Sequence, residues 1–193
     1  MQQDNRHHRR SIRLPAFDYA GPGAYFVTLV TEYRACIFGT ITNDSMALSP
    51  QGIIADACWR AIPEHFAHVE LGGYVVMPNH IHGIILLSER ETAKPSHVGA
   101  THWVAPTSGE RLPTRPTGPA RGSLGAILGA YKMAVTRQIV AQFGGVSRIW
   151  QRNYYEHVIR DDEDWNRIQR YIAENVANWS RDEENAGARD SAI

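Results

Sequence analysis

Two short apolar segments joined by a proline and an asparagine constrain the fold of this chain more than any other feature. Residues 71–77 and 81–87 are both strand-like, and the Pro78-Asn79 pair between them is typical of a tight turn. The pattern predicts an antiparallel β-hairpin over residues 71–87. Any architecture for the chain has to contain this hairpin.

The spacing of apolar residues, together with turn and capping signals, predicts the other elements. In chain order these are a strand over 24–31, a helix that Ser49 caps and Pro50 opens, the two hairpin strands, a helix from Ser123 to Gly144, a strand-like segment over 149–159 and a last helix after Asp161. The last helix carries an apolar stripe made of Trp165, Ile168, Ile172, Val176 and Trp179.

This order of elements indicates one α+β domain. It is compatible with a ferredoxin-like antiparallel sheet that has helices packed on one face, and two domains would be cramped in 193 residues. We expect three parts outside the core. They are a basic N-terminal arm over 1–16, a flexible insertion loop over 89–121 that is rich in Pro, Gly, Ser and Thr, and a polar, frayed C-terminal tail over 180–193.

The composition is that of a soluble, folded protein, with 43% hydrophobic and 21% charged residues. The longest apolar runs span four residues, so we expect no transmembrane helix. The first ten residues lack the apolar region of a secretion signal. Because there are two cysteines and no Cys-x-x-Cys pair, the sequence indicates a cytoplasmic protein with no membrane association.

The formal net charge is zero, but the charges are unevenly distributed along the chain. Residues 111–160 carry eight basic side chains and one acidic one, whereas residues 161–193 carry four basic and nine acidic ones. Of the 20 basic side chains 18 are Arg, whose planar guanidinium suits bidentate contacts with phosphate. The total charge argues against a basic nucleic-acid tail, and the clusters still allow local contacts with phosphates.

His80 and His82 near the start of the second hairpin strand form the first candidate site. Residues two apart on a strand point to the same face, so the two imidazoles project side by side and can share a divalent ion. Imidazole binds several metals, and the pair alone does not identify one. Two ordinary surface histidines are the alternative explanation of this short motif.

Tyr171 and Asn175 on the last helix form the second candidate site. They lie one helical turn apart and are neighbours on the flank of the apolar stripe. A phenol in that position is held by packing and can still point outward, as a nucleophile requires. The alternative is an amphipathic tyrosine whose ring packs and whose hydroxyl contacts water.

Together the two sites form a recognisable arrangement, in which a His-hydrophobe-His strand is followed much later by a helical Tyr with an amide four residues on. Further motifs are HRRSIRL (8–14), GAYFVT (23–28), VVMPNHIHG (75–83), GAI (125–127), IWQRNYYEHVIR (149–160) and YIAEN (171–175). In order and spacing these motifs resemble the HUH single-tyrosine transposases, and more closely the REP-associated tyrosine transposases of bacteria. One departure is Val176, because the family usually has Pro directly after the Asn.

The resemblance implies the HUH endonuclease fold and an enzyme of DNA strand transfer. Carried over by position, His80 and His82 would bind Mg²⁺ or Mn²⁺, and Asn175 would be the third protein ligand. Tyr171 would be the nucleophile that displaces a 3′ oxygen of single-stranded DNA and forms a 5′-phosphotyrosine. Attack by a second 3′-OH on this linkage would complete strand transfer.

Basic residues outside this site are the expected DNA contacts. They are Arg9, Arg10, Arg13, Arg121, Lys132, Arg148, Arg152 and Arg160. Arginines beside aromatic residues suit single strands and hairpin ends, because guanidinium groups pair with phosphates and rings stack on bases. We therefore expect single-stranded or hairpin DNA as the partner of a protein that acts as a monomer or a homodimer.

Two other functions remain open from the sequence. One is a domesticated module that binds DNA or RNA hairpins and no longer cuts them. The other is a metal hydrolase that uses His80 and His82 and releases a free 5′-phosphate. The presence of all four candidate site residues favours the strand-transfer enzyme.

Overall fold

The structure, a computed structural model, describes residues 21–89, 119–145 and 148–185. Its main sheet is fully antiparallel and has the strand order β4-β5-β1-β6. These strands are β1 (Gly23–Val30), β4 (Val69–Val76), β5 (His80–Leu87) and β6 (Tyr155–Ile159). The predicted N-terminal arm over 1–16 and nearly all of the predicted loop over 89–121 lie outside the described residues.

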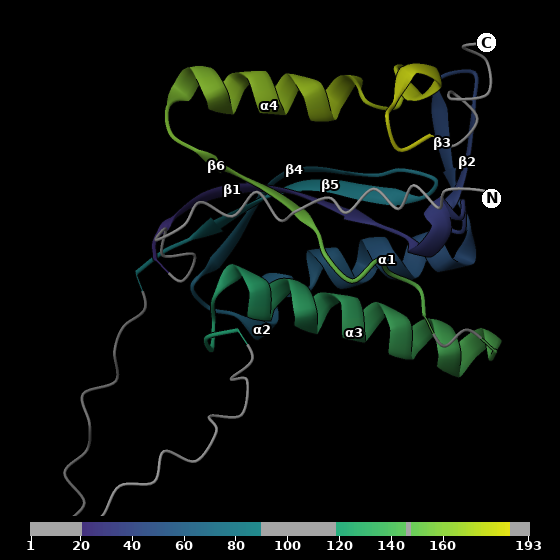
Figure 1. Ribbon diagram of the computed structural model, residues 1–193, viewed down its shortest axis with the longest axis horizontal. Helices are drawn as coiled ribbons and strands as arrows, with labels where there is room; N and C mark the ends of the chain where they lie inside the picture. Colours follow the sequence, from purple (N-terminus) through teal and green to yellow (C-terminus); the bar gives the residue numbers. More distant parts are fainter. Residues whose placement is uncertain (1–20, 90–118, 146–147, 186–193) are drawn as a thin grey trace, which may run out of the picture.

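The helices form layers on both faces of this sheet. They are α1 (Pro50–Arg60), α2 (Ile62–His65), α3 (Leu124–Phe143) and α4 (Asp162–Glu174), with the 3-10 turns η1 (Glu32–Arg34) and η2 (Trp179–Arg181). Figure 1 shows α1 and α3 on one face of the sheet and α4 on the other. The α+β fold with its antiparallel sheet is therefore confirmed, while the expectation that the helices lie on one face is wrong.

The central strand β1 explains the layers, because both of its faces are buried. Tyr25, Val27 and Leu29 belong to the larger core between the sheet and helices α1 and α3. Phe26 points to the other face, where it forms a smaller core with Ile84 of β5 and two residues of α4. These two, Ile168 and Ile172, come from the predicted apolar stripe of the last helix. The stripe of α4 is therefore buried on the sheet face opposite α1 and α3.

Three predicted helix starts are confirmed by their caps. The Oγ of Ser49 accepts a hydrogen bond from the amide of Gly52 at 3.0 Å, and Asp161 caps α4 in the same way through the amide of Asp164. Ser123 caps α3. The helix α4 ends at Glu174, and the chain then turns into η2. Val176 and Trp179 therefore lie beyond α4, although the periodicity placed them on it.

One hairpin of the structure has no counterpart in the expected order of elements. The strands β2 (Gly39–Thr42) and β3 (Ser45–Leu48) pair with each other and form a separate two-stranded sheet. Asn43 and Asp44 connect them with φ values of 51° and 54°, the left-handed conformation that two-residue hairpin turns require. Asn and Asp adopt this conformation more readily than other non-glycine residues, so this pair was the sequence signal for the turn.

No helix in the described part of the chain is both long enough and apolar enough to cross a membrane.

Candidate metal and nucleophile site

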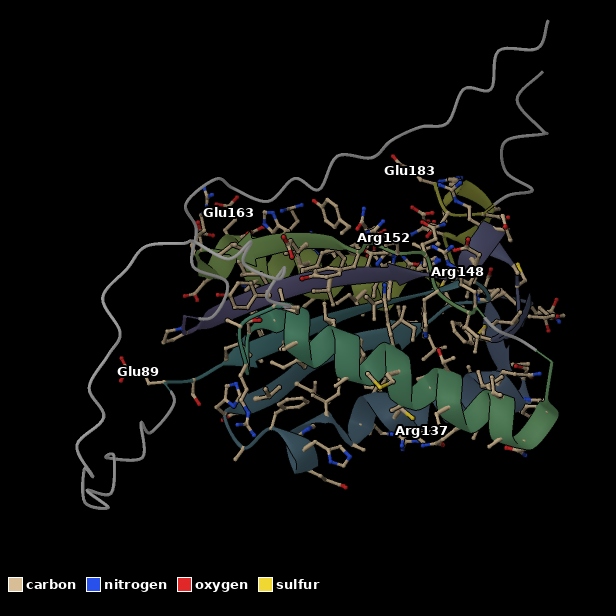
Figure 2. All side chains as sticks on the ribbon, turned by 60° about the horizontal axis from the view of Figure 1, so that its bottom comes forward. Glu89, Arg137, Arg148, Arg152, Glu163 and Glu183 are labelled. Carbon is tan, nitrogen blue, oxygen red and sulfur yellow. The ribbon has the colours of Figure 1, made fainter. Side chains whose placement is uncertain are left out.

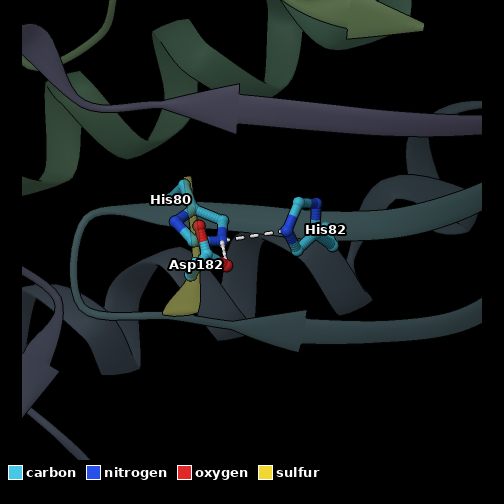
Figure 3. Close-up of side chains that lie close together, drawn as sticks. All are labelled: His80, His82 and Asp182. Atoms are coloured by element: carbon cyan, nitrogen blue, oxygen red, sulfur yellow. Dashed lines mark hydrogen bonds and ion pairs between the residues drawn. The ribbon is translucent and has the colours of Figure 1, made fainter. Parts of the chain in front are cut away.

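The two histidines of the sequence motif lie on the face of β5 that α4 covers. His80 and His82 are 0% and 3% exposed, and the ring of His82 stacks on Phe26. Their Nε2 atoms are 3.0 Å apart (Figure 3). An ion at about 2.1 Å from each imidazole nitrogen, the usual distance for such bonds, would fit between them.

The partners of the Nδ1 atoms fix how the two rings are oriented. Asn79 donates through Nδ2 to the carbonyl oxygens of Arg34 and Glu184, so its Oδ1 is left to accept a hydrogen bond from Nδ1 of His80 at 2.8 Å. The other Nδ1, that of His82, lies 2.9 Å from Oγ1 of Thr28. Because His80 carries its proton on Nδ1, its Nε2 has a free lone pair, as a metal ligand requires.

Both imidazoles are neutral in this environment. Burial lowers the pKa of His80 to about 3, and the nearby charge of Arg34 acts in the same direction. Burial also holds the pKa of His82 well below its usual value, and repulsion from a protonated His80 would lower it further, while the charge of Glu184 opposes both effects. Neutral imidazole is the form that binds metal ions.

Tyr171 projects from α4 toward the histidines. Its hydroxyl oxygen lies 3.2 Å from Nε2 of His82, while the residue as a whole stays 47% exposed. Burial raises the pKa of the phenol, the charge of Asp182 raises it further, and a hydrogen bond with Asn175 opposes both effects. The phenol is therefore protonated at neutral pH and can be reached from solvent.

Asn175 follows the last residue of α4 and is 3% exposed. In the described part of the chain its Oδ1 is buried and has no hydrogen-bond partner. A buried carbonyl oxygen without a donor costs about 1–3 kcal/mol, so its presence calls for an explanation. The structure thus brings together His80, His82, Tyr171 and Asn175, the four residues expected at the site.

Asp182 is a member of this site that sequence reasoning missed. Its Oδ2 lies 3.6 Å from Nε2 of His80, and its side chain is 5% exposed (Figure 3). Burial raises the pKa of this carboxyl, and the charge of Glu184 adds to the effect. The signal in the sequence was the acidic run Asp182-Glu183-Glu184, which is also typical of a solvated tail.

The expected frayed tail is wrong for residues 180–185, because Asp182 contacts His80 and Glu184 is anchored in the body of the protein. Glu184 is buried, and its carboxylate accepts a hydrogen bond from Nε of Arg34 at 2.7 Å. The carbonyl oxygen of the same residue accepts from Asn79. These contacts hold Asp182 close to His80, because only one residue separates it from Glu184. The rest of the predicted tail, 186–193, lies outside the described residues.

The donor atoms of this site fit a divalent cation. One ligand atom each from His80, His82 and Asp182 lie within 4.8 Å of one another. Asn175, whose Oδ1 has no partner among the described residues, forms a side-chain hydrogen bond with Asp182 and so lies beside this group. A buried carboxylate beside two neutral imidazoles is unfavourable without a positive partner. Mixed nitrogen and oxygen ligands suit several divalent metals.

The basic residues expected to contact DNA occupy different places. The Nζ of Lys132 donates to the carbonyl oxygens of Gln151 and Asn153, so this side chain holds the segment before β6 on α3. Arg148 pairs with Glu32 at 3.5 Å and is otherwise exposed. Figure 2 shows Arg148 and Arg152 in the same part of the molecule as Glu183, and the Glu32 partner of Arg148 belongs to the same turn, η1, as the Arg34 that holds Glu184. Two further candidates, Arg121 and Arg160, are exposed, and Arg9, Arg10 and Arg13 lie outside the described residues.

The arrangement of strands and helices is similar to that of a solved transposase structure. The REP-associated tyrosine transposase bound to a REP hairpin has a TM-score of 0.54 at 18% identity, over 82% of this chain and 69% of that one. A putative transposase from Deinococcus radiodurans has a TM-score of 0.39 at 17% identity, over 79% of this chain and 90% of that one. The chain thus has the fold of the REP-associated tyrosine transposases, as the motifs indicated.

The chain also has a relative along nearly its whole length. An uncharacterized protein of Haemophilus influenzae is 37% identical over 180 residues, which cover 92% of this chain and 93% of that protein. The chain belongs to the same family as this Haemophilus influenzae protein. No family model matches the chain.

Proposed function

We propose that this protein cleaves single-stranded DNA and transfers the strand through a covalent bond to Tyr171, and that Mg²⁺ or Mn²⁺ occupies the site beside it. The observation that carries the proposal is the 3.2 Å distance between the Tyr171 hydroxyl and Nε2 of His82. A solvent-accessible phenol at the edge of a buried metal-type ligand set is what nucleophilic attack on a phosphodiester requires. All of these side chains come from one chain, which supports a site that needs no second subunit.

In the proposed reaction, the hydroxyl oxygen of Tyr171 forms a bond to phosphorus as the bond from phosphorus to the 3′ oxygen breaks. The phenolic proton leaves to solvent or to the departing 3′ oxygen, and the products are a 5′-phosphotyrosine and a free 3′-OH. A divalent cation held by His80, His82 and Asp182 would supply positive charge that stabilises the charge developing on the phosphate. Because one phosphodiester replaces another, a second 3′-OH can reverse the step and join a new strand.

Three sets of residues orient the imidazoles, supply oxygen ligands and hold Tyr171 in place. Asn79 and Thr28 contact the imidazoles through Nδ1, which leaves both Nε2 atoms on the side where an ion would bind. Asp182 supplies the negative charge that neutral imidazoles lack, and Asn175 supplies a neutral oxygen. Packing of Ile168 and Ile172 against the sheet holds α4, and with it Tyr171, at a fixed position.

DNA as the substrate is supported by the solved structure with this fold, which holds a REP hairpin. Within this chain, Arg152 and Arg148 are exposed and lie in the same part of the molecule as Glu183, the sequence neighbour of Asp182 (Figure 2). We therefore include hairpin DNA with single-stranded flanks in the proposal. In a bacterial cell, such an enzyme would work in the cytoplasm, on the nucleoid.

The proposal is tested by trapping the covalent product. The protein is incubated with Mn²⁺ or Mg²⁺ and end-labelled single strands copied from the DNA on both sides of its gene, and the products are separated under denaturing conditions. We expect a labelled protein adduct that EDTA prevents and that Tyr171→Phe abolishes. Tyr33→Phe, a substitution at a tyrosine that is 91% exposed, is the matched control and should retain the adduct.

An adduct that survives in Tyr171→Phe would rule out this nucleophile. Tight hairpin binding by the wild type without any adduct would identify the protein as a binding module. Release of a free 5′-phosphate with no protein attached would identify a metal hydrolase that uses the same histidines.

A further inference from the structure

A second tyrosine lies on the same face of the sheet as the site. Tyr155 is the first residue of β6, which forms the edge of the sheet. It pairs with Thr28 of β1, and Thr28 pairs in turn with His82 of β5. Directly opposed residues of antiparallel strands point to the same face, so these three side chains form one row that ends at the sheet edge.

Aromatic contacts connect this tyrosine with the nucleophile. The ring of Tyr155 meets Phe26 edge-on with the ring centroids 6.3 Å apart, and Tyr171 meets the same phenylalanine edge-on at 5.9 Å. Phe26 is buried between the sheet and α4 and cannot move freely. The two tyrosines are therefore held at a fixed spacing, one on each side of Phe26.

The position of α4 leaves Tyr155 uncovered. Where α4 approaches the sheet most closely, it packs on β4, at the edge opposite β6. Tyr155 is 41% exposed, although large aromatic side chains on a sheet face are usually covered. The neighbouring Tyr154 points to the other side and packs against the larger core. The exposed ring thus lies beside the site, at the sheet edge formed by the first residue of β6.

The charge at this end of the molecule suits a nucleic acid. Arg152 is exposed three residues before Tyr155, and Arg148 lies toward the same end (Figure 2). Guanidinium groups near an exposed aromatic ring are the combination that binds single strands, because phosphates pair with arginine and bases stack on the ring. A base that stacks on Tyr155 would bring its own phosphate toward Tyr171.

We propose that Tyr155 is a positioning residue that stacks on a base of single-stranded DNA next to the scissile phosphate. This inference rests on the proposed function and adds the contact that places the substrate. Base stacking on a ring tolerates any sequence, so Tyr155 would set where along the strand the phosphate lies and not which base is chosen.

The test that does not depend on cleavage uses the fluorescence of 2-aminopurine. A single-stranded oligonucleotide carries this base at one position at a time, and the protein is added without metal. We expect quenching at one or two adjacent positions with the wild type and with Tyr155→Phe, which keeps the ring. Tyr155→Val, which keeps a β-branched residue on the strand, should remove the quenching at these positions. Tyr33→Asn, which tolerates the left-handed backbone at that exposed position, is the control and should quench like the wild type.

The second test measures adduct formation with an abasic site at the position that is quenched. Tyr155→Val should lower the rate about tenfold on the intact strand, the size expected for one lost base stack. On the abasic strand the wild type should slow by the same factor, and the substitution should have no further effect. If the two losses multiply instead, Tyr155 does not stack on that base. If Tyr155→Val forms the adduct at the wild-type rate and keeps the quenching, the role of Tyr155 is overturned and the proposed function stands. If the wild type forms no adduct, both the proposed function and the role of Tyr155 are overturned.

Discussion

The hydroxyl oxygen of Tyr171 lies 3.2 Å from Nε2 of His82, although the two residues are 89 positions apart in the sequence. Two elements create this contact. β5 presents the histidine on the face of the sheet opposite α1 and α3, and α4 lies across that face with Ile168 and Ile172 buried against it. The same smaller core that orients α4 therefore places the candidate nucleophile beside the candidate metal ligands.

The first prediction concerns Asp182, which contributes a buried carboxylate to two neutral imidazoles. Mn²⁺ should raise the melting temperature of the wild type, because it binds the folded protein only, and a concentration of 100 times Kd stabilises by about 2.7 kcal/mol. Asp182→Asn should lower the affinity for Mn²⁺ by at least about tenfold. In metal-free buffer the same variant should unfold at a higher temperature than the wild type, since it removes a buried charge.

Glu183→Gln is the matched control for this experiment, because Glu183 is the exposed neighbour of Asp182 in the sequence. It should bind Mn²⁺ like the wild type. Equal Mn²⁺ affinities in the two variants, measured by calorimetry, would remove Asp182 from the ligand set.

The second prediction concerns Asn79, which links His80 to the segment that carries Asp182. Asn79→Ala removes the acceptor for Nδ1 of His80 and the donor for the carbonyl oxygens of Arg34 and Glu184. We expect Mn²⁺ affinity to fall about 10- to 100-fold, as for other residues that orient metal ligands. The free energy of unfolding in urea should fall by about 1–3 kcal/mol, since two carbonyl oxygens lose their donor.

Asn178→Ala provides the comparison, because Asn178 is an exposed asparagine whose Nδ2 donates to the carbonyl of Glu174. Its effect on stability should stay within about 0.5 kcal/mol. An Asn79→Ala protein that keeps full Mn²⁺ affinity would show that the ring of His80 needs no such partner.

Most of the main sheet and its helices could be predicted because each element carries a local signal. The predicted strand over 24–31 corresponds to β1, and the caps at Ser49, Ser123 and Asp161 mark the starts of three helices. The side of the sheet on which each helix packs has no local signal. It depends on which face of β1 and β5 remains apolar after the first helices are placed, and this is a property of the whole sheet.

The site was predictable only where a motif marks it. His80, His82, Tyr171 and Asn175 stand in motifs, and the structure brings them together. Asp182 lies in an acidic run that reads as a solvated tail, and it reaches the site because the chain turns back after α4 and Arg34 holds Glu184. Such long-range contacts leave no periodicity in the sequence, so the position of the carboxylate could not be expected.

The third prediction compares two glycines. A Cβ on Gly83, next to His82 on β5, would overlap the indole ring of Trp59 in the larger core. Gly83→Ala should therefore destabilise the protein by about 1–3 kcal/mol, as overpacked core positions do. A Cβ on Gly129 of α3 would meet no atom within 4 Å, so Gly129→Ala should stabilise by about 0.5–1 kcal/mol through the better helix propensity of Ala. Urea unfolding of both variants checks the signs, and a neutral Gly83→Ala would show that Trp59 can move aside.

The last prediction concerns Tyr74 of β4, whose hydroxyl donates a hydrogen bond to Oδ1 of Asp56 on α1 at 2.8 Å. Burial, this hydrogen bond and the carboxylate charge raise the pKa of Tyr74 to about 12 from its usual value of about 10. Between pH 10 and 12 the folded protein therefore holds a proton that the unfolded chain has lost. The stability that Tyr74 contributes is complete below pH 10 and is lost as the pH rises through 12.

Urea unfolding of the wild type and of Tyr74→Phe at several pH values measures this contribution directly. The stability advantage of the wild type over Tyr74→Phe should be constant below pH 10 and should shrink steadily above it. Tyr131 also has a raised pKa, chiefly because it is buried, and the charge of Tyr74 is the smallest of its causes, so most of its contribution is common to both proteins. Asp56→Asn keeps an oxygen acceptor and removes the charge, so it should make the loss above pH 10 less steep. A wild-type advantage that stays constant to pH 12 would show that Tyr74 titrates normally and that its bond to Asp56 is open to solvent.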